Sequence, residues 1–330
     1  MRKIAFALAA TLVTASVLAV GCNQKNEQEI IDIYMPDGAP ALALGYPMYE
    51  DKADDEVEYH VVSSATIQSY VTGNSPKADV CVLPVNLAAK LLGDASAYKM
   101  AGVVTHGNMY LIANDTAQYA RENATDLIGK TVGVVQLNNV PGLTLKAALS
   151  GLDVPFVDLS DGASKSDAAV NLLPVDVQTL AGADLYLVPS PAADKRVEKA
   201  GFAFVGSLQE LYGGENGYPQ AAIVVKNEVL EKNGEWFGSF MRSVNASADW
   251  LETAEKTLIA ETVQACLAEG LSPTFTAENL TDGAIAHSGV WLQYMDESGV
   301  QDVENFLRRL AAIDASKATV PQKQFYYYGK

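Results

Sequence analysis

Asp37 and His106 are the only pair of side chains in this sequence that we can assign to acid–base chemistry. Such catalysis requires both groups within hydrogen-bonding reach of one substrate, and the sequence does not give their separation. One histidine and one carboxylate therefore do not predict an enzyme. Metal-ligand spacing is also absent, because His60, His106 and His287 are far apart and lack cysteine partners. We predict no catalytic residues, no metal and no cofactor.

Polar residues that follow strand-like runs point instead to ligand binding. The Pro-Asp-Gly turn at residues 36–38 separates the apolar run at Ile31 from the helical stretch ALALG. Turn chemistry alone explains it, since Pro fixes φ, Gly accepts positive φ and Asp bonds its own backbone. The other interpretation is that the turn exposes the Asp37 carboxylate and the amides of Gly38 and Ala39 to a ligand.

Further candidates for ligand contact lie near the ends of strand-like runs or near a proposed crossover between domains. Each has a structural alternative: Ser and Asn cap helices, Asn tolerates left-handed backbone, a histidine can make a structural hydrogen bond, and a tyrosine can be a surface aromatic rather than a stacking platform. The candidates are Ser63, Ser64, Asn86, His106, Asn138, Asn139, Ser190 and Tyr218.

The candidate loops PDGAP, SSAT, LPVN, QLNNVPG and VPSP contain no Arg or Lys. Tight binding of sulfonate or phosphonate often uses a guanidinium fork. Helix N-termini can bind anions without one, so anions are not excluded. A small organic ligand that is neutral, zwitterionic or heterocyclic fits the loops better.

Strand-length apolar runs alternate with helical patterns, which predicts α/β layers with parallel strands. Ligands of such sheets bind beyond the carboxyl ends of the strands, where the candidate loops lie. Two α/β series are followed, from about Val229, by a helical part. The series are either two sequential domains or an interleaved pair. In the second case MYLIAND and AAIVVKNE are expected to be paired crossover strands that form a hinge.

Composition limits the function classes. The chain has 330 residues, is 49% hydrophobic and 8% aromatic, and carries a formal net charge of −17. Nucleic-acid binding is not expected, because phosphate neutralisation needs a basic surface. Cys81 and Cys266 both lie in apolar patterns, and we favour two buried free thiols over a disulfide.

The N-terminus has a positive start, an apolar stretch and the sequence LAVGC, which together are typical of a secretory signal. It resembles a bacterial lipoprotein signal, in which Cys22 is lipidated; simple secretion and a retained anchor are the alternatives. Residues 23–29, NQKNEQE, suit a flexible tether.

The chain as a whole resembles the substrate-binding proteins of ABC transporters, in the branch that binds nitrate, taurine or sulfonate, and thiamine pyrimidines. LAVGC, PDGAPALAL, ADVCVLPVNLAAKLLG and GKTVGVVQLNNVPGLTLKAAL carry the likeness, in that order. The resemblance implies a two-lobed α/β fold of the type II periplasmic-binding-protein class, with a helical C-terminal part. It implies a first lobe from residues 30–112 and 222–330, a second from 113–221, and two crossover strands between them.

The resemblance further implies a monomeric, non-enzymatic protein, lipid-anchored outside the cytoplasm. It would hold its ligand between the lobes and deliver it to an ABC permease and ATPase. Two alternatives stay open. Menaquinone-pathway enzymes resemble this fold, and a surface sensor or adhesin would have the same sequence features.

Overall fold

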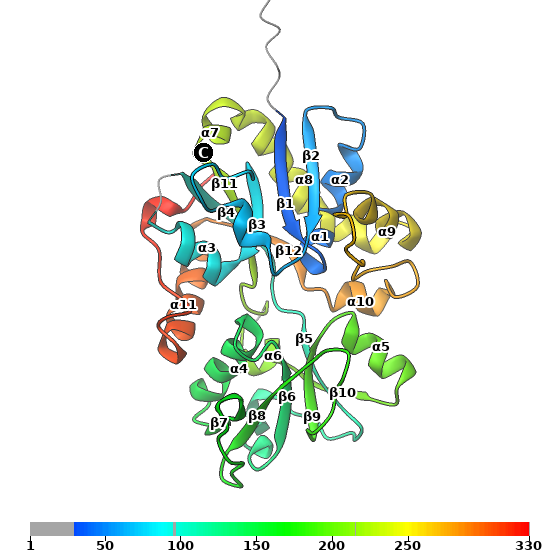
Figure 1. The fold of residues 1–330 in the computed structure, drawn as a ribbon, viewed down its shortest axis with the longest axis vertical. Coiled ribbons are helices and arrows are strands. Elements are labelled where there is room, and N and C mark those ends of the chain that lie inside the picture. Colours follow the sequence, from blue (N-terminus) through cyan, green and yellow to red (C-terminus); the bar gives the residue numbers. More distant parts are fainter. Residues whose placement is uncertain (1–29, 95–96, 215, 330) are drawn as a thin grey trace, which may run out of the picture.

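The computed structural model describes residues 30–94, 97–214 and 216–329 (Figure 1). The predicted signal peptide, Cys22 and the tether at 23–29 lie outside these ranges. Within them, no helix combines the length and the apolar character that crossing a bilayer would need.

The first half of the molecule is built on a six-stranded sheet with the order β12-β4-β11-β3-β1-β2. β1, β2 and β3 are parallel, whereas β11 runs antiparallel to β3 and β4, and β12 antiparallel to β4. Its central strands are apolar on both faces, as expected for strands covered by helices on both sides. The strands are β1 Ile31–Pro36, β2 Val57–Val62, β3 Val80–Pro84, β4 Tyr98–Thr105, β11 Ala221–Lys226 and β12 Val290–Tyr294.

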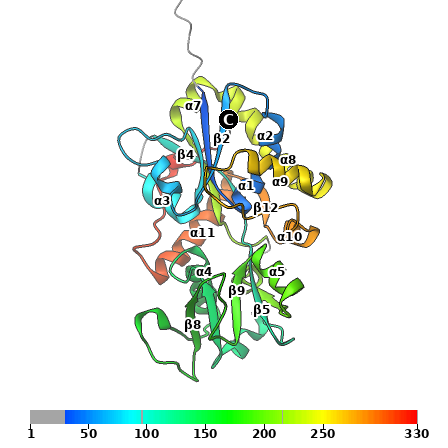
Figure 2. The same ribbon diagram turned by 45° about the vertical axis from the view of Figure 1, so that its right-hand side comes forward.

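The second half repeats this design with the order β10-β5-β9-β6-β8-β7. β6, β7, β8 and β9 are parallel, and β5 runs antiparallel to both β9 and β10. The two sheets lie one above the other along the long axis (Figures 1 and 2). The strands are β5 Met109–Ala113, β6 Thr131–Val135, β7 Phe156–Asp158, β8 Val170–Val175, β9 Leu185–Pro189 and β10 Ala203–Ser207.

The chain crosses between the sheets twice, so the interleaved arrangement holds. It leaves the first sheet after Thr105, enters the second at Met109, and returns with Ala221. The expected pairing of MYLIAND with AAIVVKNE is wrong, because β5 pairs with β9 and β10 while β11 pairs with β3 and β4. The first crossing therefore falls at residues 106–108, ahead of the predicted boundary at 112. Gly107, with φ +82°, turns the backbone there.

Helices cover the sheets in layers. α1, α2, α8 and α9 pack on one face of the first sheet and α3 and α11 on the other; α4 and α6 pack on one face of the second sheet and α5 on the other. The helices are α1 Ala39–Ala43, α2 Gly45–Glu50, α3 Val85–Leu92, α4 Val140–Gly151, α5 Ala192–Lys199, α6 Leu208–Tyr212, α7 Asn227–Lys232, α8 Gly234–Thr253, α9 Lys256–Ala265, α10 Asp282–Ala286 and α11 Glu297–Ile313. Short 3₁₀ turns are η1 Ile67–Tyr70, η2 Arg121–Leu127, η3 Leu159–Asp161 and η4 Lys323–Phe325.

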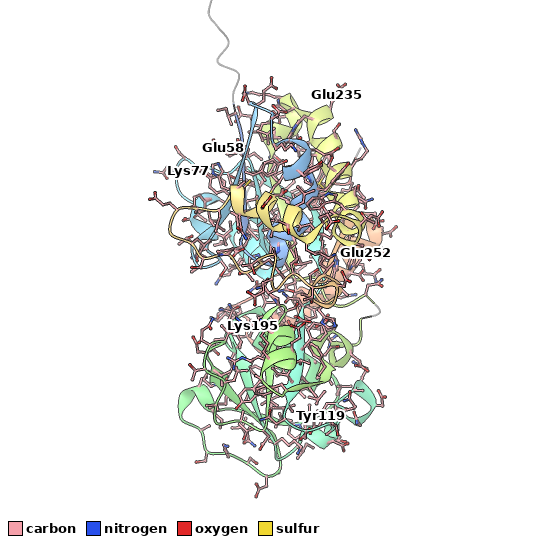
Figure 3. All side chains as sticks on the ribbon, turned by 90° about the vertical axis from the view of Figure 1, so that its right-hand side faces the viewer. Glu58, Lys77, Tyr119, Lys195, Glu235 and Glu252 are labelled. Atoms are coloured by element: carbon pink, nitrogen blue, oxygen red, sulfur yellow. The ribbon has the colours of Figure 1, made fainter. Side chains whose placement is uncertain are left out.

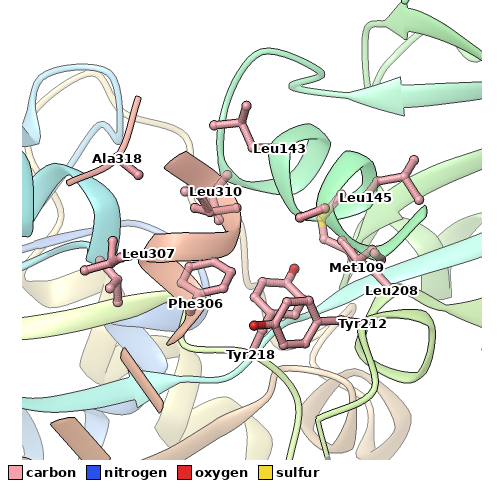
Figure 4. Packing of buried hydrophobic residues seen from close by; sticks show 14 of the residues in the cluster. Met109, Leu143, Leu145, Leu208, Tyr212, Tyr218, Phe306, Leu307, Leu310 and Ala318 are labelled. Atoms are coloured by element: carbon pink, nitrogen blue, oxygen red, sulfur yellow. The ribbon is translucent and has the colours of Figure 1, made fainter. Parts of the chain in front are cut away.

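One hydrophobic core continues from the first half into the second. α11, which follows the last strand of the first sheet, buries Phe306 and Leu310 against α4, α6 and the return crossing (Figure 4). The chain end docks on the first sheet, where Tyr326 is 2% exposed and the amide of Tyr327 donates to Met100 O at 2.8 Å. The two halves are therefore joined by packing as well as by the two crossings.

Candidate ligand-binding site

The carboxyl ends of the parallel strands of both sheets point at the junction between the halves (Figures 1 and 2). Strand polarity requires this. β4 ends at the first crossing, and β1, β2 and β3 share its direction. β5 starts at the crossing and runs away from it, so its antiparallel neighbour β9, and β6 beside β9, end facing the first sheet. The loops that follow these strands carry most of the predicted ligand residues.

The loops after β1 and β2 are adjacent, since the Asp37 amide donates to Val62 O at 2.9 Å. Both oxygens of the Asp37 carboxylate already accept hydrogen bonds from protein groups. Oδ1 accepts from the Gly38 amide at 2.8 Å, and Oδ2 accepts from the amide and the hydroxyl of Thr274, both at 2.7 Å. Gly38 has φ +104°, which explains a glycine here, and Ala39 is buried.

Ser63 and Ser64 differ in their surroundings. The Ser63 hydroxyl accepts weakly from the Ala65 amide at 3.3 Å, a local turn contact. Ser64 is exposed. Neither is the residue before η1, which is Thr66.

Asn86, His106 and the return crossing are neighbours at the carboxyl ends of β3 and β4, where two backbone hydrogen bonds join the adjacent residues. Val85 donates its amide to Gln220 O at 3.0 Å, and Gln220 donates to Thr105 O at 2.9 Å. Asn86 is 6% exposed and donates to Lys317 O at 3.0 Å, while its own Oδ1 is buried and has no hydrogen-bond partner among the residues that the structure describes. The cap interpretation of Asn86 is wrong, because it lies inside α3 and Pro84 precedes that helix.

His106 is buried inside the junction. Its ring stacks on Trp291 at 3.6 Å between centroids and 18° between planes, and Nε2 lies 3.3 Å from Gln293 Oε1. Burial, which outweighs the opposing hydrogen bond to Gln293, lowers the pKa of His106 to about 3. The ring is therefore neutral at physiological pH. Because Asp37 is bonded to Thr274 instead, the structure does not join the two residues into an acid–base pair.

The sequence predicts Tyr218 either as a stacking platform for a ligand or as a surface aromatic, and in the structure it is neither. It is fully buried, and its ring is stacked against Phe306 with 5.7 Å between centroids. A Cβ on Gly107 would lie 2.7 Å from the Tyr218 ring, and a Cβ on Gly217 would lie 2.0 Å from His106 O. Glycine at both positions lets the two crossings pass this closely.

Asn138 and Asn139 are exposed in the loop between β6 and α4. Asn139 precedes α4, yet its side chain makes no cap bond, so the first amides of this 12-residue helix have no side-chain cap from it. Gln136, also exposed, has φ +60°, an uncommon conformation for a non-glycine residue. A Cβ on Gly142 would lie 1.9 Å from Leu137 O, which explains a glycine in the first turn.

Ser190 belongs to a chain of three polar side chains that the sequence did not predict. Its hydroxyl donates to Asp194 Oδ2 at 2.7 Å, and Asp194 Oδ1 lies 2.7 Å from Nδ1 of His287. The carboxylate sits between the hydroxyl and the imidazole, so the imidazole cannot take the serine proton directly. In a nucleophilic triad the imidazole lies between the serine hydroxyl and the carboxylate. We therefore assign no catalysis to this group.

Two cavities are lined by residues outside these loops, and the smaller one lies beside the first crossing, because its lining residue Trp291 stacks on His106. One of about 650 Å³ is bordered by α8, by Tyr294 and by the chain end at Tyr327 and Gly329. One of about 160 Å³ lies between the end of α8 and the start of β12, beside Trp291. None of the predicted ligand residues lines either cavity.

Sequence spacing also missed a cluster on β1 and β2. Ligand atoms of Asp32, Glu58 and His60 all lie within 4.8 Å of one another. His60 Nε2 is bonded to Asp32 Oδ1 at 2.7 Å, and the ring stacks on Tyr34. The register of the parallel strands, which pairs Asp32 with Glu58, brings them together. Partly exposed acidic clusters are common without an ion, and we assign no metal here.

No protein-family model matches this sequence, and no curated protein matches it. Solved structures do. An ABC transporter protein from Parabacteroides distasonis has a TM-score of 0.65 at 15% identity, covering 90% of this chain and 98% of that one. The periplasmic aliphatic sulphonate binding protein SsuA from Escherichia coli has a TM-score of 0.63 at 11% identity, covering 91% and 97%. A DSZB mutant in complex with biphenyl-2-sulfinic acid has a TM-score of 0.56 at 15% identity, covering 90% and 96%.

These likenesses define the class of fold. The chain has the two-lobed α/β fold of the solute-binding proteins of ABC transporters. More particularly, sulfonate-binding proteins share this fold, which confirms the fold that the sequence resemblance implied. At these identities the likeness concerns the fold, and the DSZB structure has the same fold as well.

Proposed function

We propose that this chain is the extracytoplasmic solute-binding component of an ABC importer. Its two lobes capture a small organic ligand at their junction and present it to a membrane permease and its ATPase. One observation carries the proposal: two sheets joined by two crossings direct the carboxyl ends of their parallel strands at each other, which is where α/β sheets bind ligands. The lobes would be residues 30 to about 107 with 221–330, and about 108–220.

Two exposed polar loops are the proposed contacts, one from each lobe: Ser63 with Ser64, and Asn138 with Asn139. Gln136 supports the second loop, because strained backbone concentrates at functional sites. Val140 begins α4, whose first amides can donate to a ligand oxygen. The exposed groups are amides and hydroxyls without Arg or Lys, which suits a neutral, zwitterionic or heterocyclic ligand.

Asp37 and Ser190 already make side-chain hydrogen bonds to protein groups. Asn86, His106 and Tyr218 pack against protein groups, and each keeps one buried polar atom without a partner among the described residues, namely Oδ1, Nδ1 and the hydroxyl. In this arrangement they shape the junction, and we propose them as support for the loops rather than as direct contacts. Lipidation at Cys22 and anchoring outside the cytoplasm belong to the same proposal, as does a monomeric, non-enzymatic protein. The enzyme alternative has one supporting observation, the DSZB structure.

Native mass spectrometry of the full-length chain, purified without added ligand, tests this function. A discrete bound small molecule supports it and gives the ligand class. An empty protein is then screened by thermal shift against vitamins, pyrimidines, sulfonates and amino acids. A ligand at ~100 Kd adds ~2.7 kcal/mol of stability. Turnover of a bound compound, or no stabilisation by any of them, counts against the importer function.

A further inference from the structure

The two halves contact each other through chemically different surfaces on the two sides of the crossings. On the α11 side the contact is mainly aromatic, because Phe306 packs on Tyr212 and Tyr218. Arg309 lies over the Tyr212 ring at 3.8 Å and donates to Tyr212 O at 3.3 Å and to Ala147 O at 3.4 Å. On the α10 side the contact combines aromatic packing with a buried carboxylate. α11 and α10 lie on opposite sides of the junction in both ribbon views.

The α10 side centres on His287, the residue that follows α10. Its ring contacts β5, β10 and α5 of the second half. Centroid distances are 4.4 Å to Tyr110 and 4.9 Å to Phe204, and Nδ1 lies 2.7 Å from Asp194 Oδ1. Asp194 is only 6% exposed, so the contact buries a carboxylate whose two oxygens both have partners.

Two further contacts join the same surfaces. Ser190 Oγ lies 3.3 Å from the carbonyl oxygen of Ala284 in α10. Lys199, on the same helix as Lys195 in Figure 3, lies 2.7 Å from Glu278. The segment that carries Glu278, Ala284 and His287 is fixed to the first half, because Phe275 and Leu280 are each 1% exposed in its core.

The same segment is tied to the loop after β1, where Thr274 donates twice to Asp37. Residues 274–287 therefore reach from the loop after β1, which supports the proposed ligand site, to α5 of the opposite half. Polar groups can exchange protein partners for water when surfaces part. The hydrogen bond between His287 and Asp194 is therefore a contact that water can replace if the two halves separate.

We propose that His287 and Asp194 form a latch that holds the two halves together and sets how readily they separate. The latch regulates access to the ligand site, and in that respect it rests on the proposed function. It is a property of this chain's own junction, and it operates without a bound ligand.

Hydrogen–deuterium exchange of the full-length chain, with no ligand added, tests the latch. His287→Ala should speed exchange in peptides covering α10 and the start of α5 by about tenfold, the loss expected when a buried charged hydrogen bond is removed. Peptides from β6 should not change. His60→Ala is the matched control, because His60 also pairs with an aspartate at 2.7 Å but within one sheet. Unchanged exchange at α10 and α5, or an equal change in His60→Ala, overturns the latch.

A charge swap at an exposed ion pair gives a second test, which requires no substitution of a buried residue. Lys199 and Glu278 are exposed, with 53% and 80% of their side chains accessible. Lys199→Glu and Glu278→Lys should each speed hydrogen exchange in the same peptides by about twofold, which is the size of effect that a surface ion pair allows. The double variant should restore the exchange rate of the natural chain. Failure of restoration contradicts the docking of these surfaces. Since no ligand is present, neither result depends on whether the proposed function holds.

Discussion

Phe306 and Tyr218 stack across the junction of the two sheets, with 5.7 Å between ring centroids and 21° between ring planes. Phe306 lies on α11, after the chain has returned to the first sheet, and Tyr218 lies on the return crossing itself. Both rings are fully buried. Through this contact the C-terminal helix packs against the second half (Figure 4), so the stability of the halves is coupled.

Phe306→Ala should destabilise the whole molecule by about 3–5 kcal/mol, the usual cost of removing a buried aromatic ring. Urea unfolding monitored by circular dichroism measures it. Tyr328→Ala is the control, because that ring is 50% exposed and its loss should cost no more than about 0.5 kcal/mol. Equal midpoints for the two variants would show that the contact does not stabilise the junction.

His106 should not titrate in the physiological range. Burial lowers its pKa to about 3, whereas the unfolded chain takes up this proton near pH 6.5. Its contribution to stability is therefore present above about pH 6.5 and falls as the pH decreases below it. Nitrogen NMR of the imidazole between pH 5 and 8 checks this. A single unchanging neutral form is expected, and a midpoint near 6.5 contradicts the buried placement.

Asp194 should contribute stability that is lost in acid. Burial by itself raises the pKa of this carboxyl, but hydrogen bonds from His287 and Ser190 outweigh it and hold the pKa below its ordinary value. The contribution is present above the unfolded value of about 4 and disappears as the pH falls through the folded value. His287 and Tyr110 are the titratable groups packed against it. Melting temperatures from pH 3 to 6 should fall less steeply for Asp194→Asn than for the natural chain.

Cys81 and Cys266 are free thiols, as expected, although Cys266 is only half-buried. Burial raises the pKa of both, to about 11 for Cys266 and further for Cys81. Iodoacetamide followed by peptide mass spectrometry should label Cys266 slowly and Cys81 only after denaturation, because the thiolate is the reactive form. Rapid labelling of Cys81 in the native protein would contradict its buried position.

The alternation of strand-length apolar runs with helical patterns predicts the two α/β units. The hydrophobic pattern of each segment reflects how that strand or helix is buried, so it can be read from the sequence. The residues of a strand do not show which other strands it pairs with. The sequence predicts MYLIA as a strand, yet its placement in the second sheet depends on the turn at Gly107 and on pairing with β9. Strand order therefore came only from the structure.

The site residues divide in the same way, into those that follow from local pattern and those that depend on contacts between distant segments. Loops at strand ends were predictable from topology, and Asn138 and Asn139 are exposed in such a loop. Contacts between distant segments were not: His287 and Asp194 lie 93 positions apart, and Asn86 bonds a carbonyl 231 positions away. No local pattern marks either pair, because the neighbours of a residue in the sequence do not show which distant segment its side chain contacts.

Hydrogen–deuterium exchange with the ligand identified by native mass spectrometry is the most direct test of the proposed site. A ligand held between the lobes should protect residues 63–66 and 136–140 together, because each loop belongs to a different lobe. Protection confined to one lobe, or to residues 234–242 beside the 650 Å³ cavity, would contradict a site at the junction.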